Sequence, residues 1–133
     1  MPSGGAFLHP GYNCQLAVDS DHQVIVAVGV SNQSPDFEHL EPMLERIVAS
    51  AGALPAVMTM DAGYWSENNV NVCADQGIDA YIATGRLPHG QKLPPKRGPL
   101  PKNANTKTRM ARKLRSKKWD RGSTPSAKRP WNR

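Results

Sequence analysis

The alternation of apolar and polar positions in residues 12–30 predicts two β-strands joined by a tight turn. The segments are YNCQLAVD (residues 12–19) and the valine-rich QVIVAVGV (residues 23–30), with DSDH (residues 19–22) overlapping the end of the first. Asp and Ser are typical turn residues, and β-branched side chains favour strands. We therefore expect an antiparallel hairpin that turns through residues 19–22.

The next segment has the period of an amphipathic helix. Its apolar residues recur at steps of three and four, which places them on one helical face: Leu40, Met43, Leu44, Ile47 and Val48. Pro42 is tolerated only in the first turn of such a helix. Gly52 is a suitable residue to end it.

A second apolar run, PAVMTM (residues 55–60), suits a strand that is buried on both faces. Ser66 can cap a helix that runs to about Gln76, and Gly77 can end it. The segment IDAYIAT (residues 78–84) then predicts a last strand. The order β–β–α–β–α–β indicates an α/β fold with at least one parallel crossover.

The amino-acid composition of the chain changes after residue 85. Five prolines in residues 86–105 predict an extended linker, assigned to residues 86–103. Residues 104–118 predict a basic helix whose apolar stripe is only Met110, Ala111 and Leu114. Residues 1–11 and 119–133 lack any periodic pattern, and we expect both to be disordered, leaving residues 12–85 as the folded domain.

Charge divides the chain in the same place. Residues 1–85 hold Arg46 against ten acids, a net charge of −9, whereas residues 86–133 hold sixteen Lys and Arg against Asp120, a net charge of +15. This asymmetry favours a globular part joined to a part that binds a polyanion. Charge alone leaves a solvated, disordered tail as an equal alternative.

Other compositional features narrow the class of protein. The chain has no apolar run of about 18 residues, which excludes a transmembrane helix and favours a cytoplasmic protein. Cys14 and Cys73 lack metal-ligand spacing and are expected to act as small apolar residues. The four histidines are scattered along the chain and also lack metal-ligand spacing. We expect them at the surface: His9, His22, His39 and His89.

One acid stands at a position typical of a functional site. Asp61 follows the apolar run VMTM and is followed in turn by AGYWS (residues 62–66). In open α/β sheets, functional groups gather at the carboxyl ends of the strands. The alternative is a turn or cap residue whose carboxylate accepts hydrogen bonds from nearby backbone N–H groups. Tyr64 and Trp65 could stack on a nucleic acid or cover the loop, and the position of Glu67 fits the helix dipole.

Three segments in this order resemble the catalytic domain of DDE-type insertion-sequence transposases. These are GYN-Q-AVD from residue 11, D-GY-S from residue 61 and GIDAYIATGR (residues 77–86). The family belongs to the RNase H-like superfamily, together with retroviral integrases. The resemblance covers residues 11–118 and implies a bacterial cytoplasmic protein that acts on transposon-end DNA and is nucleoid-associated when bound to DNA.

The resemblance also implies a chemistry. In this family three carboxylates hold two Mg²⁺ (or Mn²⁺) ions, which activate a water or a 3′-hydroxyl in DNA cleavage and strand transfer. Asp61 corresponds to the second acid of this triad, so the resemblance makes it a catalytic and metal-binding residue. Asp19 is not assigned to the triad, because the acid of the AVD motif turns a hairpin in the family.

The chain departs from the family in two places. The central first strand, which carries the first catalytic Asp, is missing, and so is the C-terminal helix with a Tyr-x-x-Arg…Glu pattern. We therefore expect a partial RNase H-like fold (β-hairpin, helix, strand, helix, strand) in a truncated, inactive copy. Reverse translation of residues 122–133 suggests a cause, since a frame shifted by two nucleotides can encode Tyr-x-x-Arg and a later Glu. We hypothesise a frameshift between about Lys118 and Gly122, which the nucleotide sequence tests.

Basic residues supply the remaining candidate contacts. The residues expected to bind DNA phosphates without reading sequence are Arg86, Arg109, Arg112, Lys113, Arg115, Lys117 and Lys118. Two further functional classes stay open beside the transposase. One is a non-enzymatic DNA-binding fragment that pairs or interferes with a full-length transposase, and the other is a product that does not fold stably.

Overall fold

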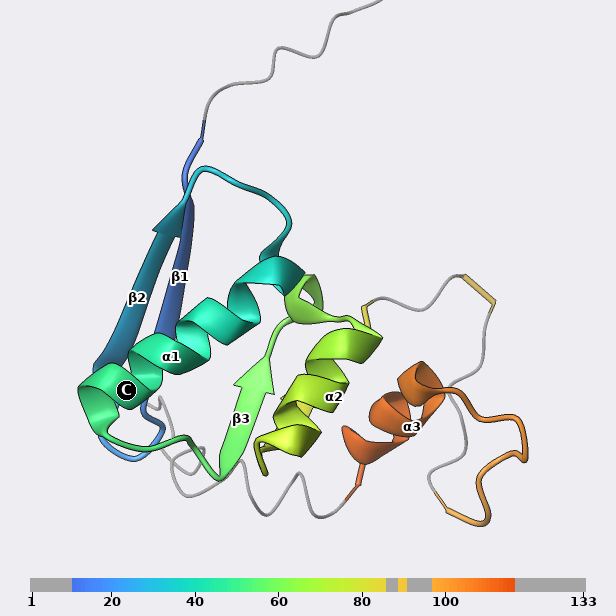
Figure 1. Cartoon of the computed structure of the whole chain (residues 1–133). Helices are drawn as coiled ribbons and strands as arrows, with labels where there is room; N and C mark the ends of the chain where they lie inside the picture. Colours follow the sequence, from blue (N-terminus) through green and yellow to red (C-terminus); the bar gives the residue numbers. More distant parts are fainter. Residues whose placement is uncertain (1–10, 86–88, 91–96, 117–133) are drawn as a thin grey trace, which may run out of the picture.

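A computed structural model describes residues 11–85, 89–90 and 97–116. Its first element is a β-hairpin of β1 (Asn13–Val18) and β2 (Ile25–Ser31), which pair antiparallel. The turn between them is closed where the Asp19 N–H donates to the Val24 carbonyl at 2.9 Å. The predicted hairpin is therefore confirmed (Figure 1).

Helix α1 (Leu40–Ala51) follows the one-turn 3-10 helix η1 (Asp36–His39) and crosses one face of the hairpin (Figure 1). Pro42 lies in its first turn, where a proline costs no hydrogen bond. Gly52 ends the helix in the left-handed conformation (φ 79°), and its N–H donates to the Val48 carbonyl. The predicted helix and its stop are both confirmed.

The second half of the domain is a β–α–β unit. β3 (Val57–Met60) and β4 (Asp79–Ile82) pair in parallel, and α2 (Glu67–Asp75) connects them after the short 3-10 helix η2 (Ala62–Tyr64). The Ser66 hydroxyl caps α2 by accepting a hydrogen bond from the Asn69 N–H at 3.0 Å. The predicted parallel crossover is confirmed.

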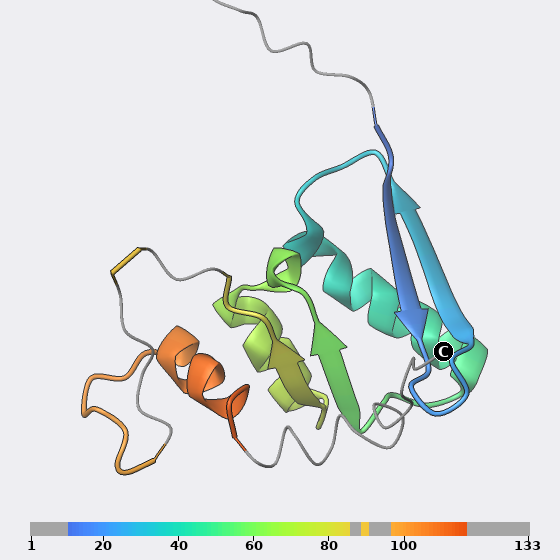
Figure 2. The same cartoon turned by 180° about the vertical axis from the view of Figure 1, so that it is seen from behind.

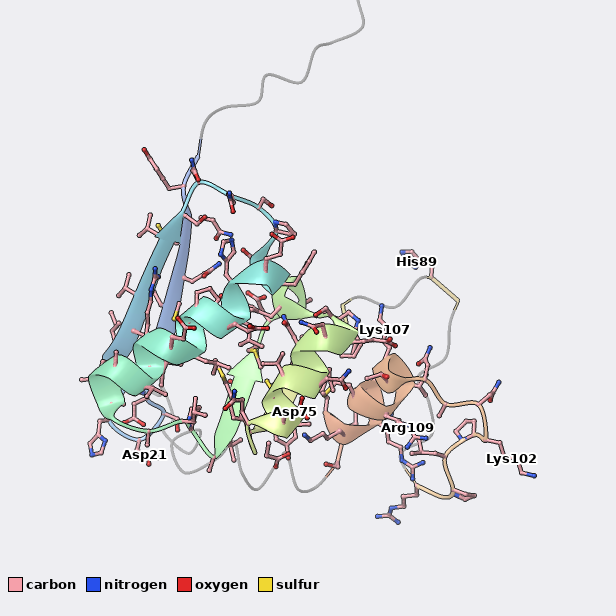
Figure 3. The ribbon with its side chains drawn as sticks, in the orientation of Figure 1. Asp21, Asp75, His89, Lys102, Lys107 and Arg109 are labelled. Carbon is pink, nitrogen blue, oxygen red and sulfur yellow. The ribbon has the colours of Figure 1, made fainter. Side chains whose placement is uncertain are left out.

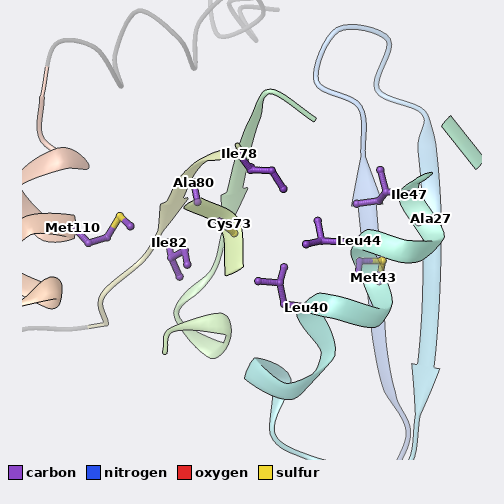
Figure 4. Packing of buried hydrophobic residues seen from close by; sticks show 10 residues of the cluster. All are labelled: Ala27, Leu40, Met43, Leu44, Ile47, Cys73, Ile78, Ala80, Ile82 and Met110. Atoms are coloured by element: carbon purple, nitrogen blue, oxygen red, sulfur yellow. The ribbon is translucent and has the colours of Figure 1, made fainter. Parts of the chain in front are cut away.

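Apolar side chains from α1, α2 and β4 join the two halves into one core (Figure 4). Leu40 of α1 and Ile82 of β4 are fully buried in it. The other buried members are Ala27, Met43, Leu44, Ile47, Cys73, Ile78, Ala80 and Met110. The core therefore runs along the helices rather than through one continuous sheet.

The strands form two separate two-stranded sheets. Within the described residues, β1 pairs only with β2, and β3 pairs only with β4. The expectation that β3 is buried on both faces is wrong, because its residues alternate and Val57 keeps 50% of its surface exposed. Figure 2 shows β3 and β4 in front of α1 and α2, and no described helix or strand covers the face of β3 turned away from these helices, so the residues on that face are exposed.

The basic segment contributes a short helix, α3 (Thr106–Lys113), which lies beside β4 (Figure 2). Asn105 caps it by accepting a hydrogen bond from the Thr108 N–H at 2.8 Å. Met110 is buried and Leu114 packs against the core, as their apolar spacing indicates.

Several expectations fall outside this description. The disorder expected for residues 1–11 and 119–133 rests almost wholly on residues that the structure does not describe, as does most of the linker, residues 86–103. In the described ranges, no helix is long and apolar enough to cross a membrane.

Candidate functional site

Asp61 lies directly after β3, at the carboxyl end of the strand, as its sequence position indicates. It is exposed and begins η2. One carboxylate oxygen, Oδ1, accepts a hydrogen bond from the Gly63 N–H at 2.8 Å. Asp61 therefore does act as a cap, the alternative role considered for it, while its other oxygen has no partner among the described residues.

A second acid, Asp36 of η1, approaches the same turn. A Cβ at Gly63 would stand 2.5 Å from Asp36 Oδ2 and 3.1 Å from Asp61 Oδ1, so both carboxylates border this glycine. Only a residue without a side chain fits between them. Sequence reasoning missed Asp36, because 25 residues separate it from Asp61 and no local motif marks it. The only sequence signal for a role of Asp36 was its position just before the predicted helix.

Asn69 of α2 holds the two turns together. Asn69 is 2% exposed, so it is almost completely buried. Its Nδ2 donates to the Phe37 carbonyl and to the Tyr64 carbonyl, each at 2.9 Å. One amide thus joins η1 to η2 from the first turns of α2. Asn13 of β1 adds a hydrogen bond from its Nδ2 to Asp36 Oδ1.

The clustered acids affect Tyr64, which follows Gly63. Partial burial raises the pKa of the Tyr64 phenol, and the negative charges of Asp36 and Asp61 raise it further. The phenol therefore stays protonated through the physiological range and can donate a hydrogen bond. Tyr64 and Trp65 are both half-buried and pack against the core, which favours the loop-covering role over an exposed stacking surface.

Asp19 lies at the opposite end of the molecule from this turn. It follows β1, which runs antiparallel to β3, so the carboxyl ends of these two strands point in opposite directions (Figure 2). Asp19 instead binds His22 within the hairpin turn at 2.9 Å. Hydrogen bonds from His22 hold the pKa of the Asp19 carboxyl below its ordinary value. This position agrees with the expectation that Asp19 does not belong to the carboxylate triad.

A two-metal centre needs more ligands than this turn supplies. Two ions about 3.5–4 Å apart require several carboxylates between them. Among the described residues, no three acids, histidines or cysteines come together as a metal-binding group. The half-buried Asp36 of η1 and the exposed Asp61 are therefore a pair of carboxylates, and they do not form a two-metal site by themselves.

The basic residues of α3 divide into two groups. Lys113 is engaged inside the chain: its Nζ lies 2.6 Å from Asp79 Oδ1, donates to the Ala80 carbonyl, and stands 4.3 Å from the centre of the Tyr81 ring. Arg112 donates to the Gly98 carbonyl. These two cations fasten α3 to β4 and to the preceding loop.

The second group is exposed. Lys102, Lys107 and Arg109 extend from α3 and the loop before it, on the side of the molecule away from Asp21 of the hairpin turn (Figure 3). Lys102 and Lys107 are not among the DNA contacts predicted from the sequence. Arg115 is half-buried. Three residues of the predicted DNA-binding set lie outside the described ranges: Arg86, Lys117 and Lys118.

One known protein family matches this chain. A family model described as "Transposase DDE domain" matches residues 2–132, nearly the whole chain. The chain belongs to this family. No curated protein and no solved structure matches it. The resemblance found in the sequence motifs is thus confirmed, and this transposase domain is an α/β protein with two small sheets.

Proposed function

We propose that this DDE transposase domain derives from an insertion-sequence transposase with an RNase H-like fold, and that it binds DNA without cleaving it. The observation that carries the proposal is the acidic site itself. Asp61 stands at the carboxyl end of a parallel strand, where the family's second triad acid belongs, but the described residues bring only Asp36 beside it. With two carboxylates in place of a triad, the described residues offer metal-dependent strand cleavage no complete ligand set.

DNA is the proposed partner because exposed cations gather on one side of the molecule. Lys102, Lys107 and Arg109 are exposed there, in a C-terminal part whose sequence carries a net charge of +15. Phosphate contacts of this kind provide affinity without sequence specificity. A fragment that binds DNA in this way, or that pairs with a full-length transposase at its target, would interfere with transposition rather than perform it.

A DNA-binding titration at several salt concentrations tests the partner. Each phosphate contact contributes about 0.9 to the slope of log K against log salt on duplex DNA. The double variant Lys107→Gln/Arg109→Gln should reduce the magnitude of this slope by about 2 and weaken binding. Arg46→Gln is the matched control, because it removes an exposed cation from the acidic half and should leave the slope unchanged. A slope near zero for the unmodified chain would exclude DNA as the partner.

A nicking assay tests the absence of cleavage. Supercoiled DNA incubated with the chain and Mg²⁺ or Mn²⁺ should stay intact, at the level seen with Asp61→Asn. The Asp61→Asn variant separates activity of this site from a contaminating nuclease. Cleavage by the unmodified chain that disappears in Asp61→Asn would contradict the proposed inactivity, and would mean that residues outside the described ranges complete the site.

A further inference from the structure

A groove of about 690 Å³ separates the two sheets. Its walls are β1 on one side and β3 on the other, and α1 forms its floor through Met43, Ile47 and Ala51. Its ends reach Asp19 and Asp61, so it runs along both strands. Figure 4 shows Met43 and Ile47 on the hairpin side of α1, within the same apolar cluster as Ile78 and Ile82.

Both walls of the groove are strand edges. Among the described residues, β1 uses only its β2 edge and β3 uses only its β4 edge, so the two remaining edges face the groove. An open edge presents a row of backbone N–H and C=O groups that pair readily with another strand. Two such edges on either side of one groove provide hydrogen-bonding partners for both edges of a single inserted strand.

The side chains along the groove define what that strand must carry. Toward α1, the inserted side chains would meet partly buried Ala17 and Met58. On the opposite face they would meet exposed Leu16, Val18 and Val57. An inserted strand would thus have apolar neighbours on both faces, with α1 covering one of them. β-branched apolar residues such as Val and Ile suit these positions best.

We propose that the groove binds one β-strand of a second polypeptide, a Val- and Ile-rich segment of about six residues. Because β1 and β3 run in opposite directions (Figure 2), this strand would lie antiparallel to one of them and parallel to the other. Its length follows from the six residues of β1 and the four of β3. The bound strand would join the two sheets into one. Its binding does not depend on whether the chain also binds DNA.

Fluorescence anisotropy with a labelled synthetic peptide tests this proposal on the full chain. The probe has the core Val-Thr-Ile-Val-Thr-Ile, flanked by one Lys and one Glu. We expect saturable binding. A peptide with the same core but N-methyl groups on alternate residues cannot donate hydrogen bonds along one edge, and should bind at least tenfold more weakly. Equal binding of the two peptides would overturn the proposal, since it would indicate apolar adhesion without strand pairing.

A matched pair of variants locates the binding. Leu16 is 59% exposed and lines the groove, whereas Val30 of β2 is 58% exposed and lies outside it. Leu16→Lys should weaken peptide binding at least tenfold, and Val30→Lys should change it by less than twofold. Equal loss in both variants would overturn the proposal. Absence of saturable binding to the unmodified chain would also overturn it.

Discussion

At the scale of single residues, Asn69 determines where the acidic site forms. It is polar and nearly inaccessible, and its amide supplies a donor to the carbonyls of two different turns. Buried polar groups persist in proteins when they are hydrogen-bonded, and each broken bond leaves the partner unsatisfied. Asp36 and Asp61 approach each other because this amide links the turns that carry them.

Replacing Asn69 with Ala should therefore destabilise the fold. The change leaves the Phe37 and Tyr64 carbonyls without a donor, and we expect the free energy of unfolding to fall by about 1–3 kcal/mol. Urea denaturation followed by circular dichroism measures this loss. Asn68→Ala is the control: Asn68 is exposed on the same helix, and its replacement should change stability by no more than about 0.5 kcal/mol. Similar effects of both changes would contradict the role given to Asn69.

At the scale of elements, α3 shows how a strongly basic segment becomes part of the fold. Met110 is its one buried residue, with 5% of its surface exposed. Lys113 contacts the backbone and side chains of β4. The ion pair between Lys113 and Asp79 is partly exposed, so solvent screens it and its contribution is small. Apolar contact at Met110 is the main reason that the helix stays against β4.

Met110→Ala should consequently loosen α3. Removal of a buried methionine side chain costs about 2–5 kcal/mol in well-packed cores, and the lower end is expected at the margin of this one. Hydrogen exchange measured by mass spectrometry should show faster exchange of the α3 amides. Lys107→Ala, an exposed change on the same helix, should leave their exchange nearly unaltered. Unchanged α3 protection in Met110→Ala would mean that other contacts hold the helix.

At the scale of the whole molecule, the two sheets differ in how well they are covered. Three residues of β4 are at most 5% exposed, namely Ala80, Tyr81 and Ile82. The hairpin is covered by α1 on one face only, and its other face exposes Leu16, Val28 and Val30. A two-stranded hairpin with one open face is marginally stable in water.

The β1–β2 amides should therefore exchange faster than those of β4. Local opening of a protein requires less free energy where fewer apolar contacts are buried. Hydrogen exchange resolved by peptide fragments compares the two regions within one sample, which removes differences in concentration and pH. Equal protection of both regions would indicate that the sheets unfold as one unit, contrary to their separate pairing.

Local patterns in the sequence were sufficient for the individual elements. The alternation in residues 12–30, the helical period from Leu40, the Ser66 cap and the Gly52 stop all depend on neighbours within one or two turns of chain, and each was confirmed. Asp61 was found for the same reason, because a strand end followed by a glycine is a local signal. The family resemblance rests on such short motifs as well.

Tertiary structure alone decided which of these elements meet. Asp36 comes to lie beside Asp61 through hydrogen bonds across more than 30 residues of sequence, and no local pattern contains that information. Lys113, one of the predicted DNA contacts, also packs on β4, and these partners become visible only when the helix docks. The exposed alternation of β3 has the same origin: burial of both faces of a strand depends on what packs over each face, and the sequence of the strand does not contain those neighbours.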